Sequence, residues 1–200
     1  MPAPQHLSFE LGRVYRTKEL SQWSTNPSRL ARRLVANGTL EPLAHGLFVH
    51  PRRGRFGAVP PTDEALMRAF LEESPYLFTG PEQWNVLGLG TTAVFPARLV
   101  YNQKRSGEFI LGGRKFLLRR IPFPRPVPPE WWVVDLIEHH EMAGLSLMAL
   151  CPALSEALAR GRFDDAVLLR VARVYGTRRT YQCIEQALLR SRGASHALHS

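Results

Sequence analysis

The sequence predicts an α+β fold with two domains. Three observations support this prediction: a short basic helix with a strand pair behind it within residues 25–51, strand-like segments on both sides of the Gly112–Gly113 pair, and helical periodicity after residue 130. A chain of 200 residues suits one domain or two small ones. We expect a first domain over residues 1–58 and a mixed α/β domain over residues 59–200, with a small antiparallel sheet and C-terminal helices.

The first predicted element is a short helix within residues 11–23. Thr17 is a suitable cap for this helix, because its hydroxyl group can accept a hydrogen bond from a free backbone N–H. Leu20 and Trp23 are three residues apart, and this spacing places both side chains on one side of a helix. We therefore expect these two side chains to face a core.

The second predicted element is a helix in the stretch "TNPSRLARRLVANG", residues 25–38. Asn26 is a favoured N-cap, Pro27 falls at the first helical position, and Gly38 suits the left-handed residue that follows a helix. Helical spacing then separates an apolar side from a basic side. The inner side contains Leu30, Ala31, Leu34 and Val35, and the outer side contains Arg29, Arg32, Arg33 and Ala36.

A strand pair follows this helix. The segments "TLEPLA" and "HGLFVHP" are predicted to form a β-hairpin that turns at Gly46, and three arginines follow in "PRRGRFG". The order of helix, link, basic helix and hairpin predicts a winged helix-turn-helix, in which the second helix enters the major groove of DNA. The candidate DNA-contacting residues are Thr25, Asn26, Ser28, Arg29, Arg32, Arg33, His45, Arg52, Arg53 and Arg55.

The chemistry and the charge of these residues both suit DNA. The Arg fork matches two acceptors on guanine, Asn matches adenine in the same way, and Ser, Thr and a helix N-terminus match phosphates. The net charge of +9 is uneven: residues 1–60 carry +6, residues 61–97 carry −4, residues 98–130 carry +6 and residues 131–200 carry +1. Clustered positive charge indicates a polyanionic partner, although a basic surface that only keeps the protein in solution is the alternative.

The second domain is predicted from turn signals and periodicity. Its elements, in order, are a helix capped by Thr62 or Asp63, a brief strand in "YLFTG", a helix in "GPEQWNVLGLG", strands in "ARLVYNQ", "GEFILGG" and "RKFLLRRI", and four helices after residue 130. Gly112–Gly113 suits a two-residue hairpin. The five prolines of "IPFPRPVPPE" predict an extended connector, and we expect the tail from Ser191 to be frayed.

Other candidate sites are weaker. Cys151 and Cys183 are far apart and lie in apolar surroundings, so they are interpreted as buried thiols. Asp135, Glu138 and His139 have a helical spacing that can hold a metal ion, but no second motif complements them and a solvated helix face is the favoured interpretation. "GLGTT" is interpreted as a helix end and turn, and the Trp131–Trp132 pair as an anchor for the proline connector. We expect no metal ion and no cofactor.

The location of the protein is predicted from two absences in the sequence. No apolar run approaches the ~18 residues that a membrane helix needs. The N-terminal stretch "MPAPQHLSFELGR" lacks the basic start and the long apolar centre of a signal peptide. We therefore expect a cytoplasmic protein without a membrane partner.

Three ordered motifs suggest a family. They are the opening "G-x-V-Y … E-L", the basic helix that ends in "L-V-x-N-G-x-L" and runs into "L-x-H-G-L-F", and the later "G-L-G-T-T … P" before a strand. Within residues 11–120 this order resembles the AbiEi-type antitoxins. The resemblance implies DNA contacts at Ser28, Arg29, Arg32 and Arg33 and at the wing around His45.

The resemblance also implies a function. The N-terminal domain would bind double-stranded promoter DNA and repress its own operon, and the C-terminal domain would help to neutralise a nucleotidyltransferase-like toxin in abortive phage infection. The protein would not be an enzyme. Two alternatives stay open: a stand-alone transcriptional regulator, and a metal-dependent nucleic-acid enzyme centred on Asp135, Glu138 and His139. The second basic region, residues 98–125, could face DNA, RNA or the toxin.

Overall fold

The chain crosses repeatedly between two structural units. The computed structural model describes residues 8–91 and 94–197. Unit 1 comprises the residues up to Tyr76 together with Asn102–Arg120, and unit 2 comprises Leu77–Tyr101 together with the residues from Ile121 onward. The predicted boundary between residues 58 and 59 lies inside unit 1. The assignment of separate functions to the two sides of that boundary stays a prediction.

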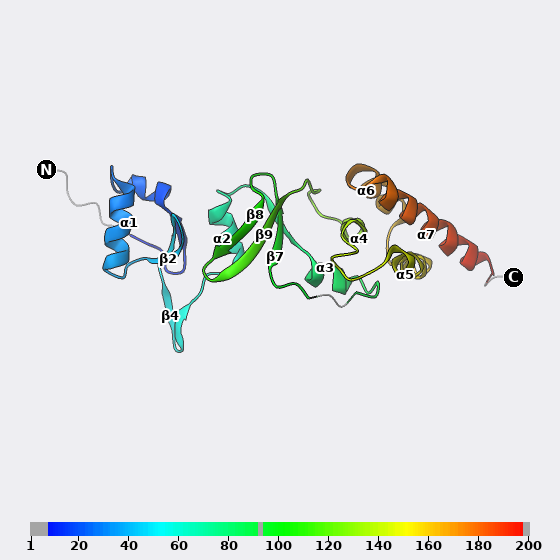
Figure 1. The fold of residues 1–200 in the computed structure, drawn as a ribbon, viewed down its shortest axis with the longest axis horizontal. Helices are drawn as coiled ribbons and strands as arrows, with labels where there is room; N and C mark the ends of the chain where they lie inside the picture. Colours follow the sequence, from blue (N-terminus) through cyan, green and yellow to red (C-terminus); the bar gives the residue numbers. More distant parts are fainter. Residues whose placement is uncertain (1–7, 92–93, 198–200) are drawn as a thin grey trace. The chain divides into compact units, whose positions relative to one another are not determined.

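Unit 1 begins with a three-stranded antiparallel sheet and two helices (Figure 1). The elements are β1 (Val14–Arg16), the 3₁₀ helix η1 (Thr17–Gln22), α1 (Pro27–Ala36), β2 (Glu41–Ala44) and β3 (Leu47–Val49). The strand order is β1-β3-β2, with Tyr15 and Pro42 both opposite Phe48. The predicted helix α1 and the predicted hairpin β2–β3 are confirmed.

The segment before α1 differs in part from the prediction. The predicted helix within residues 11–23 is the shorter η1, and Thr17 is its first residue instead of its cap. The Glu19 carboxylate accepts a hydrogen bond from the Arg16 backbone N–H (2.7 Å) at this helix start. Strand β1 was not predicted, because its pairing with β3 joins residues more than 30 positions apart in the sequence.

The core of this part of unit 1 lies between α1 and η1. Leu20, Leu30 and Leu34 are buried there, as predicted. Tyr15 and Leu40 complete the cluster, and Phe9 and Trp23 pack against it. The packing leaves only one side of α1 exposed to solvent, and it therefore determines the direction in which the basic side faces.

A second hairpin follows the sheet. Strands β4 (Arg52–Gly54) and β5 (Gly57–Val59) pair antiparallel, and the turn between them contains Arg55 and Phe56. We call this hairpin the arginine ribbon. The sequence predicted only a run of three arginines after the β2–β3 hairpin here. The ribbon projects from the sheet of unit 1 (Figure 1).

The rest of unit 1 contains one helix and one long hairpin. Helix α2 (Asp63–Phe70) has Thr62 as its N-cap, and the Thr62 hydroxyl accepts a hydrogen bond from the Ala65 backbone N–H (3.2 Å). Strands β8 (Gly107–Leu111) and β9 (Arg114–Arg120) pair antiparallel. Gly112 and Gly113 form the turn with positive φ values of 55° and 76°, which confirms the predicted hairpin.

Unit 2 is mainly helical. It contains the neighbouring strands β6 (Tyr76–Thr79) and β7 (Arg98–Asn102), except for Tyr76 and Asn102, which belong to unit 1, and its first helix is α3 (Pro81–Val86). The later helices are α4 (Pro129–Glu138), α5 (Leu147–Ala159), α6 (Asp165–Tyr175) and α7 (Arg178–Ala197). Helix α4 packs against α3 and α6, and α7 packs along α5 and α6. These elements and the non-helical proline connector confirm the prediction for this part of the chain.

Two predictions about the C-terminal helices are wrong. The tail from Ser191 was expected to be frayed, but α7 continues to Ala197, and residues 198–200 lie outside the described residues. Cys151 and Cys183 were expected to be thiols, but they form a disulfide between α5 and α7. Their Cα atoms are 6.3 Å apart, within the range of protein disulfides, because the two helices pack side by side. The separation of 32 residues in the sequence gave no sign of this contact.

The remaining sequence predictions concern a turn and the membrane. After α3, Gly88 and Gly90 have positive φ values of 62° and 90°, which confirms the predicted helix end and turn. The last residue of "GLGTT", Thr92, lies outside the described residues. Over residues 8–91 and 94–197, none of the helices combines the length and the apolar character that crossing a bilayer requires.

Candidate functional site

The start of α1 is fixed by the residues that the sequence indicated. The Asn26 side-chain oxygen Oδ1 accepts a hydrogen bond from the Arg29 backbone N–H (3.0 Å), and Pro27 occupies the first turn. Gly38 follows the helix with a φ of +75°, a conformation that favours glycine. The cap occupies one lone pair of Oδ1, so a contact between this oxygen and a base would share it with the Arg29 N–H. A bidentate contact to adenine would require both this oxygen and the amide nitrogen.

The predicted basic side of α1 faces solvent. Arg29, Arg32 and Arg33 are exposed, on the side opposite the buried Leu30 and Leu34. Within the described parts of the chain, none of the three arginines forms an ion pair with a carboxylate. Thr25 and Ser28, which precede them, are also exposed at the helix start. These cations are therefore available to a partner outside the chain.

A pocket brings some of the predicted residues together with others that the sequence did not indicate. The pocket has a volume of about 920 Å³ and lies within unit 1. Ser28, Arg32 and His45 line it, and none of its described lining residues is acidic. The additional cations on its wall are Arg16, Lys18 and Arg105. Arg105 is 73 positions after Arg32 in the sequence, and no local pattern could have placed it there.

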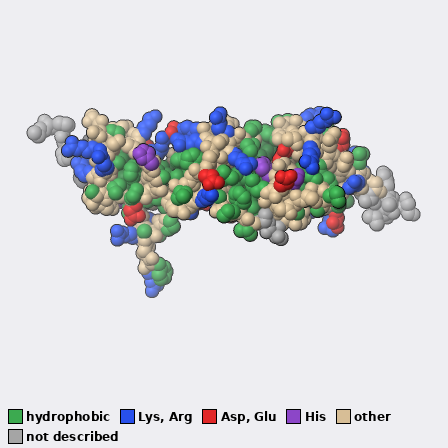
Figure 2. Space-filling view, in the orientation of Figure 1, with side chains coloured by type: hydrophobic (Ala, Val, Ile, Leu, Met, Phe, Trp, Pro, Cys, Tyr) green, Lys and Arg blue, Asp and Glu red, His purple; other side chains and the backbone are tan. Residues whose placement is uncertain are grey.

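The other predicted arginines lie on the arginine ribbon. Arg52, Arg53 and Arg55 are exposed and, among the described residues, have no carboxylate partner. They do not line the pocket. The structure therefore places the predicted set in two groups, one on α1 with His45 and one on the ribbon. Lys or Arg side chains and hydrophobic side chains are both visible at the end of the ribbon (Figure 2).

The second basic region has a different environment. In unit 1, Lys104 pairs with Glu72 (2.5 Å), and Arg114 pairs with Asp63 (2.6 Å). The Lys104 ammonium group and the Arg16 guanidinium group lower the pKa of the Glu72 carboxyl from its usual value. Lys115 pairs with Glu108 within the β8–β9 hairpin, and Arg98 of unit 2 pairs with Glu82. Half of the basic residues between positions 98 and 130 are therefore neutralised by carboxylates of the same chain.

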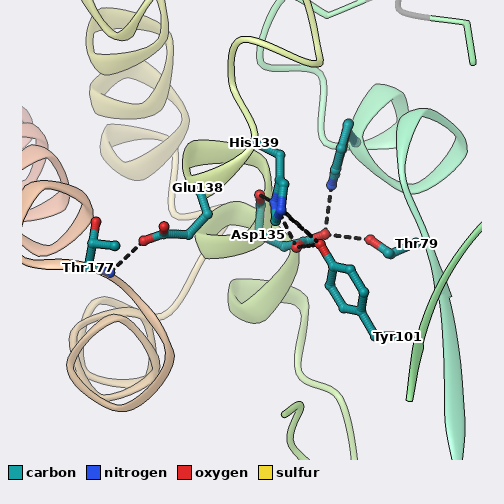
Figure 3. A network of polar contacts seen from close by, with 7 residues as sticks. Thr79, Tyr101, Asp135, Glu138, His139 and Thr177 are labelled. Atoms are coloured by element: carbon teal, nitrogen blue, oxygen red, sulfur yellow. Dashed lines mark hydrogen bonds and ion pairs between the residues drawn. The ribbon is translucent and has the colours of Figure 1, made fainter. Parts of the chain in front are cut away.

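A buried carboxylate in unit 2 was not anticipated. The Asp135 carboxylate was interpreted as part of a solvated helix face, but its side chain is only 2% exposed. Figure 3 shows the polar contacts that surround it. One oxygen, Oδ1, accepts a hydrogen bond from the Tyr101 hydroxyl (2.8 Å). The other, Oδ2, accepts hydrogen bonds from the Trp84 indole N–H (2.9 Å) and the Thr79 hydroxyl. The solvated interpretation is wrong because α4 packs against β6, α3 and β7 on this side.

His139 completes this network, and Glu138 points away from it (Figure 3). The His139 Nδ1 atom lies 3.3 Å from the Asp135 carboxylate, and its ring stacks on Trp84 with a centroid distance of 5.9 Å. The Glu138 carboxylate instead accepts a hydrogen bond from the Thr177 backbone N–H (2.5 Å). The three residues of the possible metal site therefore do not converge. Over residues 8–91 and 94–197, no group of three or more potential ligands is placed to hold a metal ion.

The Asp135 network holds secondary-structure elements together. Its donors come from β6, α3 and β7, and its acceptor comes from α4. The carboxylate accepts three hydrogen bonds from side chains of these separate elements. Trp131 is buried next to Tyr101, with ring centroids 6.0 Å apart, and it anchors the end of the proline connector as predicted. The network is therefore best explained as a set of structural hydrogen bonds that holds α4 against β6, α3 and β7.

Comparisons with known proteins identify the fold only. No family model matches this chain. No curated protein sequence matches it either. Among solved structures, the chain is similar to the crystal structure of the Rv2827c protein from Mycobacterium tuberculosis, with a TM-score of 0.50 and 16% sequence identity. The similarity covers 92% of this chain and 76% of that chain. The shared fold is a mixed α/β arrangement of helices and small antiparallel sheets.

Proposed function

We propose that this protein is a transcriptional repressor that binds double-stranded promoter DNA through a winged helix-turn-helix in unit 1. The observation that carries this proposal is the environment of Arg29, Arg32 and Arg33. They lie on the solvent side of a capped helix whose opposite side is packed, and they have no ion-pair partner among the described residues. A helix presented in this way can enter the major groove, where Arg reads guanine.

The order of the elements supports the winged-helix interpretation. A strand, a short helix, the basic helix and a hairpin follow one another, and the first strand lies beside the last in the order β1-β3-β2. In this arrangement α1 is the recognition helix and the turn at His45 is the tip of the wing. Thr25 and Ser28 would contact phosphates at the helix start, and Asn26 would contribute through its free amide nitrogen. Arg52, Arg53 and Arg55 would add backbone or minor-groove contacts.

The experiment is a triple substitution in the full-length protein. Replacement of Arg29, Arg32 and Arg33 by Ala should weaken binding to the DNA upstream of the gene by about 100-fold or more, because each good base or phosphate contact contributes ~1–3 kcal/mol. The slope of log affinity against log salt should also fall by ~0.9 for each phosphate that the variant no longer neutralises.

A matched control removes the same charge elsewhere. Arg178, Arg179 and Arg190 on α7 are exposed as well, and their replacement by Ala should have a much smaller effect on DNA affinity. Equal affinities for the wild type and the α1 variant would refute the recognition-helix proposal.

We also propose that the protein acts as the antitoxin of a nucleotidyltransferase-like toxin in a phage-defence system. This part rests on the resemblance of residues 11–120 to AbiEi-type antitoxins. The first observation to make is the neighbouring gene, which should encode a nucleotidyltransferase-like protein. Co-expression of this chain should then relieve growth arrest by that toxin. If no such reading frame is adjacent, a stand-alone transcriptional regulator becomes the better proposal.

We further propose that the protein is not an enzyme and needs no metal ion or cofactor. The alternative of a metal-dependent nucleic-acid enzyme depends on Asp135, Glu138 and His139. The three protein donors already surround the Asp135 carboxylate, and Glu138 points toward Thr177. Metal analysis of the purified protein tests this alternative. A stoichiometric metal ion together with nuclease or transferase activity that Asp135→Ala abolishes would reverse the proposal.

A further inference from the structure

Within the described part of the chain, the arginine ribbon is a two-stranded sheet that packs against no core. Every residue of β4 and β5 is exposed, so neither side of the ribbon contributes to a core. The pairs Arg52–Val59, Arg53–Ala58 and Gly54–Gly57 hold the two strands together. An isolated two-stranded hairpin is marginally stable in water and usually gains stability by packing against a further surface. The ribbon therefore lacks the surface that such hairpins normally pack against.

The tip of the ribbon presents an aromatic ring to solvent. Phe56 is 98% exposed, and the Arg55 guanidinium carbon lies 5.8 Å from the centre of its ring. Val59, at the base of the ribbon, is 46% exposed. A single exposed apolar residue on a protein surface needs no explanation. Here, however, the most exposed large hydrophobic side chain in the described parts of the molecule stands at the end of a projecting hairpin.

The charge of the ribbon indicates the partner. Arg52, Arg53 and Arg55 are basic, and residues 50–60 contain no acidic residue. Proteins that bind the minor groove of DNA combine arginines with an exposed apolar wedge, which enters between two base pairs and kinks the duplex. The ribbon has both parts, with the wedge at its tip and the arginines beside and behind it.

We propose that Phe56 is a DNA-bending wedge. The ribbon enters the minor groove next to the site of α1, Arg52, Arg53 and Arg55 contact the groove and its phosphates, and the Phe56 ring inserts between adjacent base pairs. This inference rests on the proposed DNA-binding function of unit 1. It adds that the bound DNA is kinked, by an angle within the range of about 20–90° that such wedges produce.

The experiment measures affinity and bend angle separately, with the full-length protein and the upstream DNA. Energy transfer between dyes at the two ends of a duplex of about 30 base pairs reports the bend. The wild type should shorten the end-to-end distance. The Phe56→Ala variant should lose most of the bend and bind about 10-fold more weakly, since the stacking of a base on an aromatic ring has an effect of this order. Phe56 is exposed, so this substitution should leave the fold unchanged.

Two further variants serve as controls. Phe56→Trp keeps an aromatic ring at the tip and should retain the bend. Val59→Ala removes an exposed apolar side chain from the base of the ribbon and should change neither the DNA affinity nor the bend angle.

The outcomes separate this inference from the proposed function. If the α1 triple variant loses affinity while Phe56→Ala bends DNA like the wild type, the proposal that Phe56 is a wedge is refuted. The proposal that α1 is the recognition helix is then supported. If the wild type does not bind the duplex at all, both proposals fail. Binding of the wild type to vesicles that contain anionic lipid, lost in Phe56→Ala and accompanied by no bend in DNA, would assign the ribbon to a membrane surface and overturn the inference.

Discussion

The two basic regions of this chain carry the same net charge but differ in how far ion pairs within the chain neutralise them. Residues 1–60 and residues 98–130 each carry a net charge of +6. In the first region, the arginines of α1 and of the arginine ribbon are exposed and form no ion pair among the described residues. In the second, Lys104 and Arg114 are held by carboxylates of the preceding acidic stretch, at Glu72 and Asp63. Net charge by itself therefore does not locate a binding surface.

The difference has a physical consequence. A cation that is already paired within the chain contributes to the folded state, and its removal leaves a carboxylate without its partner. An unpaired cation on the surface contributes little to folding, because water solvates it in both the folded and the unfolded state. It remains able to release the counterions of a nucleic acid. We therefore expect substitutions in the second region to lower stability and substitutions in the first region to lower DNA affinity.

The largest expected effect extends the comparison to Asp135, a buried acidic side chain outside both basic regions that accepts three hydrogen bonds within the chain. Asp135→Ala removes the acceptor for the Trp84, Tyr101 and Thr79 donors and leaves three buried polar groups without that acceptor. We expect a loss of about 3–5 kcal/mol in the free energy of unfolding, measured with urea. Affinity for DNA at a temperature where the variant is folded should stay unchanged.

The conservative variant Asp135→Asn is the control for this substitution. It keeps the size and one oxygen acceptor, so its loss of stability should be smaller. A loss of less than about 1 kcal/mol in the free energy of unfolding for Asp135→Ala would show that the network does not stabilise the fold.

A pair of single substitutions tests the comparison directly. Arg114→Ala removes the ion pair with Asp63 and the hydrogen bond to the Pro61 carbonyl, and it should lower the free energy of unfolding by about 1–2 kcal/mol, a figure reduced for the partial exposure of Arg114. Arg32→Ala, with no ion pair to lose, should change stability by less than about 0.5 kcal/mol. In a DNA-binding assay, Arg32→Ala should lower the affinity more than Arg114→Ala does. If both variants lose DNA affinity equally, the second basic region belongs to the interface.

The smallest expected effect concerns pH. The Lys104 and Arg16 cations lower the pKa of Glu72 below the unfolded value of 4.5. Their stabilising contribution is therefore fully present above that unfolded value and is lost as the pH falls through the lower pKa of the folded state. The difference in unfolding free energy between the wild type and Glu72→Gln should be constant down to about pH 5.5 and should shrink at lower pH. A difference that grows on acidification would contradict the assigned direction of the pKa shift.

Local signals in the sequence determined much of the secondary structure. Asn26, Pro27 and Gly38 fixed the ends of α1, because capping depends on residues within one turn of the helix end. The Gly112–Gly113 turn fixed the β8–β9 hairpin for the same reason. The apolar side of α1 was predicted from helical spacing alone, and the burial of Leu30 and Leu34 confirms it.

Only the tertiary structure decided which charged groups are satisfied within the chain. Asp135 meets donors 34 to 56 positions away, Cys151 meets Cys183 across two helices, and β1 joins the sheet through a strand more than 30 residues further on. Such contacts depend on how separate elements pack, and no pattern within one element encodes them. The sequence by itself determined where this chain is basic. The fold determined which of those cations remain exposed and unpaired for a partner.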